Sequence, residues 1–382
     1  MKAARKKGRR AFRKSVLFFT SLFLLIQPAK IVLSAEAAWQ AEWSKTVDAA
    51  LKEGQLNVYY WGPPYVLDGG AFQKKFPQIK LVVVSGQGGQ LQQRILSERR
   101  GDKFIADVFI DGASNFHPNM FKAKALDPIK AALILPEVTD ESKWWHGKLK
   151  YLDAERQSVI AFAGSPNYGT IGYNTTQMAP KEFKSYWDFL QPKWKGKIAA
   201  RDIAEAGGGS SPMRFFYYNP ELGSPFIRRL FGEMDVTLFR DSRQAIDWLG
   251  SGKFAICFFC PGVETAKRQG LPVDDWNKLL KEGAGISGQV GYIGLVNKAP
   301  HPHAAKVFIN WFLSREGQIA FQQEQAKADS ARDSLRIDIP KDYIPPGERR
   351  IDGGNYVELD SPDMMDMEPV RKVFREALGA KP

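Results

Sequence analysis

Short apolar runs alternate with amphipathic ones through residues 56–111, and this alternation is the feature that most constrains the fold. The apolar runs, each predicted to be a strand, are residues 56–61, 80–84 and 105–110. Amphipathic runs at 70–76 and 90–100 predict the intervening helices. Strand, helix and strand in this order predict parallel βαβ units and hence an α/β fold. In such sheets a ligand lies beyond the carboxyl ends of the strands.

The loops that follow these strands supply the first candidate ligand contacts. They contain aromatic rings, hydroxyl and amide groups, a carboxylate and the backbone of a glycine-rich loop, which suit a small polar solute. The glycine-rich loop leads into the helix expected at 90–100, whose free N–H groups and dipole favour an anion. Plain turn chemistry is the alternative for each glycine. The candidates in these loops are Tyr60, Trp61, Ser85, Gly86, Gln87, Gly88 and Asp111.

Residues 159–176 lie near the middle of the chain and predict a crossing between two lobes. Two short apolar strands, 159–163 and 170–174, are separated by a Gly-Ser-Pro-Asn cluster. An ordinary hairpin within one larger sheet is the alternative interpretation. If the crossing interpretation holds, Asn167, Tyr168 and Tyr173 lie at the edge of a ligand cleft.

The first 37 residues predict a signal peptide. Residues 1–15 carry eight basic side chains and no acid, an apolar run follows at 16–26, and Ala35-x-Ala37 fits a leader-peptidase site. The apolar run is too short for the roughly 20 residues of a membrane helix, and a retained anchor is the alternative. Residues 8–14 resemble a twin-arginine export signal, but Arg13 stands where an apolar residue is usual, so general secretion stays open. We therefore expect a periplasmic protein whose signal peptide is cleaved.

The basic character of the full chain comes from this leader. The chain has 54 Lys and Arg against 42 Asp and Glu, and residues 1–37 contain nine of the basic residues and one of the acids. The remaining 45 basic and 41 acidic residues leave a net charge of +4. We therefore expect no nucleic-acid partner. A mature chain of about 345 residues exceeds one ordinary core, which predicts two lobes.

The two cysteines, Cys257 and Cys260, leave their redox state open. They lie in an apolar run, predicted to be a strand, where an odd spacing directs side chains to opposite faces. A disulfide then requires that the strand end in a tight turn at Pro261-Gly262. A thioredoxin-like redox pair is disfavoured because no helix start follows the motif.

A second glycine-rich loop, 207–211, precedes a helix that Pro212 is expected to open, with Ser211 as its N-cap. This loop would face the first one across the cleft and, like it, favours an anion. Arg214 could neutralise a carboxylate or phosphate. The candidates of this region and of the strands beyond it are Asp202, Gly209, Ser210, Ser211, Arg214, Phe258 and Tyr292.

Several short segments are each too common to indicate a protein family, but their order and spacing along the chain are more specific. They are residues 106–109 with 126–128, 172–175, 186–190 with 194–198, 291–292 and 299–306. Together they resemble the periplasmic solute-binding proteins of ABC importers, in the branch that includes ferric-ion and thiamine binders. The resemblance implies a type II-like periplasmic-binding-protein fold, in which two crossing strands join two lobes with a cleft between them. It implies the following division: signal peptide 1–37, lobe one 38–160 and 290–382 with a wrapping C-terminal tail, and lobe two 161–289.

The same resemblance implies a function. Such a protein closes around a small polar solute by a hinge motion and delivers it to an ABC permease in the inner membrane. The glycine-rich loops favour an anionic solute. A ferric-ion binder of the same fold and a ligand-loaded partner of a membrane sensor are the alternatives.

The iron alternative is disfavoured at one position. Iron-binding members of the family carry two adjacent tyrosines where this chain has Phe258-Phe259, and phenylalanine has no oxygen for a hard cation. Tyr217-Tyr218, the other adjacent tyrosine pair after the crossing, falls inside a predicted helix.

The sequence offers no catalytic or cofactor motif in the context that such a motif requires. Residues 283–288 match G-x-G-x-x-G, but a helix precedes them and a strand follows, the reverse of a dinucleotide fingerprint. His301-x-His303 lies beside prolines at an expected helix start. The nucleophile elbow, H-E-x-x-H and P-loop motifs are absent. We expect no enzyme activity, no cofactor, no metal site and a monomeric protein.

Overall fold

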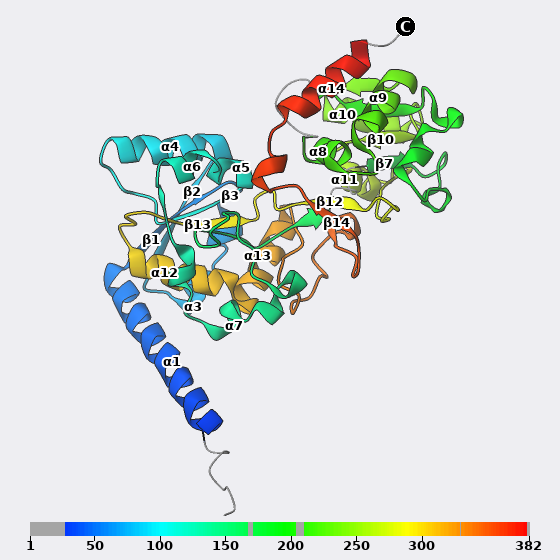
Figure 1. The fold of residues 1–382 in the computed structure, drawn as a ribbon. Coiled ribbons are helices and arrows are strands. Elements are labelled where there is room, and N and C mark those ends of the chain that lie inside the picture. Colours follow the sequence, from blue (N-terminus) through cyan, green and yellow to red (C-terminus); the bar gives the residue numbers. More distant parts are fainter. Residues whose placement is uncertain (1–26, 167–170, 204–209, 329, 380–382) are drawn as a thin grey trace, which may run out of the picture.

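The computed structural model describes residues 27–166, 171–203, 210–328 and 330–379. Within them, two α/β lobes each contain a central sheet, and a small third sheet lies between the lobes (Figure 1). The predicted two-lobe α/β fold is therefore confirmed. In the described part of the chain, no helix combines the length and apolar character needed to cross a membrane.

The sheet of the first lobe has the strand order β2-β1-β3-β13-β4, and β5 also pairs with β13. Its strands are β1 (Gln55–Tyr60), β2 (Lys80–Ser85), β3 (Val108–Asp111), β4 (Leu126–Asp127), β5 (Val159–Ala161) and β13 (Tyr292–Val296). Strand β1 pairs in parallel with both β2 and β3, as the alternation of the sequence predicts. Consecutive residues of β1 are buried, which is typical of a parallel strand covered on both faces.

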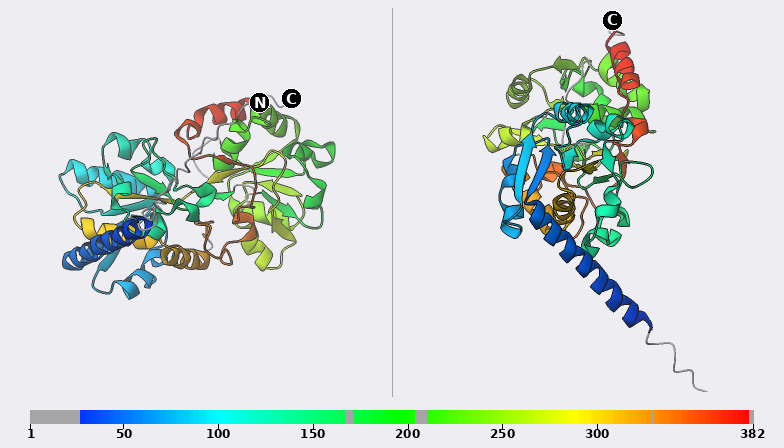
Figure 2. Two further views of the ribbon diagram at one scale, coloured as in Figure 1. Left: turned by 60° about the horizontal axis from the view of Figure 1, so that its bottom comes forward. Right: turned by 90° about the vertical axis from the view of Figure 1, so that its left-hand side faces the viewer.

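Helices of the first lobe include α1 (Gln27–Glu53), α2 (Tyr65–Asp68), α3 (Ala71–Lys75), α4 (Gly88–Arg100), α5 (Ala113–Phe116), α12 (Pro302–Leu313) and α13 (Arg315–Lys327). Helix α12 is a core helix, since nine of its twelve residues are buried. Helix α1 packs on it, and the N-terminal half of α1 projects from the lobe (Figures 1 and 2).

The sheet of the second lobe has the strand order β11-β7-β10-β8-β9. Its strands are β7 (Ile171–Asn174), β8 (Ile198–Arg201), β9 (Thr237–Phe239), β10 (Ile256–Phe258) and β11 (Val273–Asp275). Helices α8 (Ser210–Tyr218), α9 (Gly223–Glu233), α10 (Ser242–Gly250) and α11 (Val263–Arg268) belong to the same lobe. Strand β7 runs antiparallel to β10 and β11, whereas β8 and β10 are parallel. Strands β8, β10 and β11 therefore end at the same edge of the sheet.

The chain passes from lobe one to lobe two between β5 and β7, as the prediction for residues 159–176 required. Strand β5 pairs with β13 in the first lobe, whereas β7 pairs with β10 and β11 in the second. The hairpin interpretation is therefore wrong. A second crossing returns through β12 (Ala284–Ser287) to β13, and β6 (Ser165–Pro166) pairs antiparallel with β12.

The C-terminal tail makes a third crossing, which the expected two-strand connection did not include. Its first part packs on lobe one, where the buried Arg336 donates to the carbonyls of Leu313 and Glu137 at 3.0 and 3.1 Å. Strand β14 (Tyr356–Glu358) then pairs in parallel with β12. Helix α14 (Glu368–Gly379) ends on lobe two, beside α9 (Figures 1 and 2).

This end of the tail differs from the expected assignment of all of 290–382 to lobe one. The physical reason is the apolar face of α14, where Val370, Val373 and Phe374 are buried. The rings of Phe374 and Phe231 of α9 pack edge to face with centroids 4.8 Å apart. Burial of this face against α9 stabilises the helix in that position.

Candidate ligand-binding site

A cleft of about 830 Å³ lies between the lobes, and both lobes and the tail line it. Lobe one contributes Trp61, Gly112, Ala113 and Ser114. Lobe two contributes Arg201, Pro212, Arg214, Phe259, Cys260, Pro261, Gly262, Val263, Glu264, Thr265, Arg268 and Asp275. The second crossing and the tail contribute Ser287, Gln289, Ala331, Arg332, Pro345, Glu348, Asp360, Met365 and Met367. A cleft of this size is typical of a small-molecule site.

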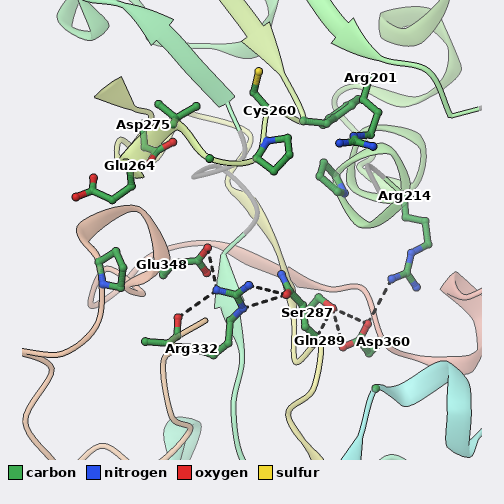
Figure 3. Close-up of a pocket in the computed structure, with 18 of the residues that line it drawn as sticks. Arg201, Arg214, Cys260, Glu264, Asp275, Ser287, Gln289, Arg332, Glu348 and Asp360 are labelled. Atoms are coloured by element: carbon green, nitrogen blue, oxygen red, sulfur yellow. Dashed lines mark hydrogen bonds and ion pairs between the residues drawn. The ribbon is translucent and has the colours of Figure 1, made fainter. Parts of the chain in front are cut away.

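Arg201 is the last residue of β8 and points its guanidinium at the cleft (Figure 3). Its Nη2 donates to Ser242 Oγ at 2.5 Å, and the guanidinium lies 5.5 Å from the centre of the Phe239 ring. Among the described residues no carboxylate forms an ion pair with it. Pro212, in the first turn of α8, lines the cleft as well, so the beginning of this helix also reaches it.

Arg214 is held by the C-terminal tail. Its Nη1 donates to the carbonyls of Leu359 and Met364 at 2.7 and 3.2 Å, and its Nη2 lies 3.4 Å from Asp360 Oδ1. The side chains of Arg214 and Asp360 are 11% and 6% exposed, so this ion pair is nearly buried. Arg214 therefore lines the cleft as predicted, but Asp360 already compensates its charge.

Asp360 also binds the second crossing. Its carboxylate accepts hydrogen bonds from Ser287 Oγ at 3.0 Å, the Gly288 N–H at 2.7 Å and the Tyr292 hydroxyl at 2.8 Å. Burial, together with the Asp360 charge, raises the pKa of Tyr292 well above its usual value, so the hydroxyl keeps its proton and donates. We call Asp360 and these four donors, including Arg214, the Asp360 network. It joins lobe two, the crossing and the tail at one point (Figure 3).

A second ion pair lies on the side of the cleft formed by the tail and the crossing. Arg332 donates through Nε and Nη2 to Gln289 Oε1 at 3.0 and 2.8 Å, and its Nη1 lies 3.3 Å from Glu348 Oε1. Figure 3 shows these groups turned toward one another. Arg332 and Glu348 therefore cancel most of each other's charge.

Two carboxylates occupy one end of the cleft, Glu264 of α11 and Asp275 at the end of β11 (Figure 3). Burial raises the pKa of Asp275 to about 8. The neighbouring charges of Glu264, Glu348 and Asp274 act in the same direction, and Lys267 opposes them. In the described part of the chain, no basic residue forms an ion pair with Glu264 or Asp275.

The disulfide question is answered by the turn after β10. Cys257 and Cys260 are bonded, with their Cα atoms 5.7 Å apart. Strand β10 ends at Phe258, and Phe259 takes a left-handed backbone conformation with φ of 62°. The tight turn that a bond requires is thus present, one to two residues earlier than expected. The bonded turn carries Cys260 and Pro261 into the lining of the cleft.

Most sequence-predicted site residues of lobe one do not line the cleft, although Trp61 does. The buried ring of Tyr60 packs against Phe321, and Ser85 Oγ donates to the carbonyl of Gly62. Gly86 and Gln87 precede α4 and Gly88 is its first residue, and all three lie outside the lining.

Asp111 is buried directly beneath the lining rather than in it. Its Oδ1 accepts from the Gly112 N–H at 2.6 Å and from Asn115 Nδ2 at 2.7 Å. Burial raises the pKa of Asp111 to about 6. Its contacts position Gly112 and the first turn of α5, which do face the cleft.

In lobe two, the structure separates further candidates from the cleft. Tyr173 packs on Trp276, and Asp202 pairs with Arg240 at 2.9 Å. Phe258 is a core residue whose ring packs on those of Phe189 and Phe216, whereas Phe259 lines the cleft. Phe259 follows the end of β10, and its left-handed backbone begins the turn that lines the cleft. Tyr292 reaches the site through Asp360.

The remaining candidates lie outside the described residues or have side chains that are not described. Asn167, Tyr168 and Gly209 fall outside the described residues. Ser210 and Ser211 open α8, but their side chains are not described.

Sequence reasoning missed several charged residues of the lining. They are Arg201, Glu264, Arg268, Asp275, Arg332, Glu348 and Asp360. Arg201 had a usable signal, because it directly follows the short apolar run 198–200 and precedes the glycine-rich loop 207–211 by six residues. The tail residues had none, since nothing local indicates that the tail returns to the cleft.

The described residues contain no group of three or more His, Cys, Asp and Glu side chains arranged to hold a metal. His301 Nδ1 instead lies 2.9 Å from Asp107 Oδ2, at the start of α12. Tyr217 and Tyr218 lie on α8 outside the lining, and the Phe258-Phe259 position offers no phenol oxygen.

Residues 48–319 match the family model described as bacterial extracellular solute-binding protein. An uncharacterized protein of Haemophilus influenzae is 23% identical over 309 residues, covering 77% of this chain and 83% of that protein. The open form of Mannheimia haemolytica ferric iron-binding protein A has a TM-score of 0.64 at 15% identity, covering 85% of this chain and 98% of that one. A Trichodesmium protein (IdiA, FutA) in complex with iron and citrate has a TM-score of 0.61 at 19% identity, covering 85% and 99%. At these identities the solved structures support the fold alone.

Proposed function

Because this chain belongs to the bacterial extracellular solute-binding protein family, we propose that it binds a small anionic solute between its lobes and delivers it to the permease of an ABC importer. The cleft supports this proposal, since its lining comes from both lobes. A solute that contacts both lobes favours the closed arrangement, and this is how binding drives a hinge motion.

The observation that carries the anionic class is Arg201. It is a cation without a carboxylate partner among the described residues, it faces the cleft, and the first turn of α8 lines the cleft as well. Free N–H groups and the dipole of a helix start favour negative charge, and a guanidinium binds carboxylate or phosphate through two parallel hydrogen bonds.

The rest of the proposal follows from the sequence. A leader of the signal-peptide type, with a twin-arginine-like segment, supports export to the periplasm, where a solute meets the inner-membrane permease. We propose that the protein acts as a monomer without turnover of the solute and without a cofactor.

Thermal shift and calorimetry with phosphorylated sugars, organic acids and phosphonates test the proposal, with thiamine, polyamines and ferric ion as competing classes. A solute at 100 times its dissociation constant adds about 2.7 kcal/mol to the free energy of unfolding. Arg201→Gln should weaken an anionic solute by about tenfold or more, since it removes a charge-assisted bond. The matched control is Arg243→Gln, an exposed arginine of the same lobe outside the lining.

Two results would overturn the proposal. In the first, only ferric ion or a cation stabilises the protein. In the second, an anionic solute binds Arg201→Gln as tightly as it binds the Arg243→Gln control.

A further inference from the structure

The charges that line the cleft separate into paired and unpaired groups. Arg332 pairs with Glu348, and Arg214 pairs with Asp360. Arg268 of α11 donates to Thr265 Oγ1 at 3.4 Å. Of the remaining charged groups in the lining, Arg201 is a cation without a carboxylate partner among the described residues, and Glu264 and Asp275 are acids without a basic one.

Arg201 and the two acidic side chains without a basic partner lie at opposite ends of the cleft. Figure 3 shows Glu264 and Asp275 at one side and Arg201 at the other, with the Cys260 turn between them. The sheet explains this separation, because β11 and β8 end at the same edge but β7 and β10 lie between them. Three strand spacings place the two strand ends about 14 Å apart. Side chains that reach inward shorten the distance a solute must span.

We propose that the solute is a zwitterion, whose anionic group binds at Arg201 and whose ammonium or other cationic group binds between Glu264 and Asp275. This inference rests on the proposed function, since it takes the cleft as the solute site and Arg201 as its anion contact. A zwitterionic solute places a group of opposite charge beside Arg201 and beside the two acidic side chains at the same time. A purely anionic solute would leave the two carboxylates without a partner and would add a negative charge to their cleft.

The surroundings of Asp275 agree with a missing cation. Glu348 faces Asp275 from the tail but forms an ion pair with Arg332. Lys267 of α11 forms an ion pair with Asp274 at 2.8 Å. The raised pKa of Asp275 is the property of a partly buried carboxyl that has acidic neighbours and no counter-ion. In the solute-free protein Asp275 therefore holds its proton at neutral pH, and a cation from the solute would supply the counter-ion that lets it ionise.

Matched pairs of compounds that differ only by an ammonium group in place of a hydroxyl test the inference. Suitable pairs are phosphoethanolamine with ethylene glycol monophosphate, glucosamine 6-phosphate with glucose 6-phosphate, and 4-aminobutyrate with 4-hydroxybutyrate. In at least one pair, we expect the full-length mature protein to bind the ammonium member about 10- to 100-fold more tightly. In the Glu264→Gln/Asp275→Asn double variant, the ratio within that pair should fall to about one. The control Asp247→Asn, an acid of α10 outside the lining, should keep the ratio.

The outcomes separate this inference from the proposed function. If the hydroxyl members bind as tightly as the ammonium members in every pair, or if no member of any pair binds, the zwitterion inference is overturned. It is also overturned if the double variant keeps the full preference. If an anionic solute still binds in such a case and Arg201→Gln still weakens its binding, the proposed function is kept although the zwitterion inference is lost. If the preference is present but Arg201→Gln leaves the affinity of both members of the pair unchanged, the proposed function and the zwitterion inference are both wrong about the anion contact.

Discussion

Asp360→Asn tests whether the Asp360 network joins the lobes, because it removes one charge while keeping the shape of the side chain. Oδ2 of Asp360 accepts from the Gly288 N–H and the Tyr292 hydroxyl, whereas Oδ1 accepts from Arg214 Nη2. In either orientation of the Asn amide, its NH₂ group faces at least one of these donors and cannot accept a hydrogen bond from it. Arg214, which is 11% exposed, then lacks its only carboxylate partner among the described residues.

The expected loss can be estimated from these contacts. Removing one partner of a buried ion pair costs about 3–5 kcal/mol, because the remaining charge is left uncompensated. The weakened bonds to Gly288 and Tyr292 fall within this range rather than adding to it, since they belong to the same network. With an unfolding entropy of about 2.1 cal/mol/K per residue, the loss corresponds to a fall in Tm of about 4–7 °C.

Differential scanning calorimetry and urea denaturation of the mature protein measure this loss. Asp363→Asn is the matched control, since it removes the same charge from an exposed position on the same tail. It should change the stability by less than about 0.5 kcal/mol. If Asp360→Asn is no less stable than this control, the network does not hold the tail to the crossing and the reasoning fails.

Two further predictions concern lobe two. Asp275 has a folded pKa of about 8, so the folded state holds a proton that the unfolded state releases, and stability falls as pH rises from about 4 to 8. Asp275→Asn removes this loss, so its Tm relative to wild type should rise between pH 5 and pH 8.5; a constant difference would contradict the shift. The Cys257→Ser/Cys260→Ser variant opens a four-residue loop, which should cost about 2 kcal/mol in urea denaturation. An unchanged midpoint in urea would contradict that estimate.

Local patterns in the sequence predicted the secondary structure around the site. The alternation through residues 56–111 became the parallel strands β1, β2 and β3, and the segment at 159–176 became the crossing. These predictions succeeded because strand and helix periodicities depend on neighbours within a few residues. The bonded cysteines were left open because the left-handed conformation of Phe259 has no signal in the residue type.

The candidate site was predicted less well than the fold. The glycine-rich loop before α4 does not line the cleft, and the tail that does was not expected there. Arg214 shows the physical reason. Its sequence position suggests a cation available to a solute, whereas its partner Asp360 lies 146 residues further along the chain.

The sequence by itself determined the α/β character, the strands that alternate with helices and the place where the chain leaves the first lobe. Only the tertiary structure decided which charged side chains of the cleft form ion pairs and which have no partner of opposite charge among the described residues. A charge is compensated by whatever opposite charge lies within a few ångströms, and such neighbours are brought together by long-range packing. Arg201, Glu264 and Asp275 therefore became candidate solute contacts only once the tail had been placed against the crossing and lobe two.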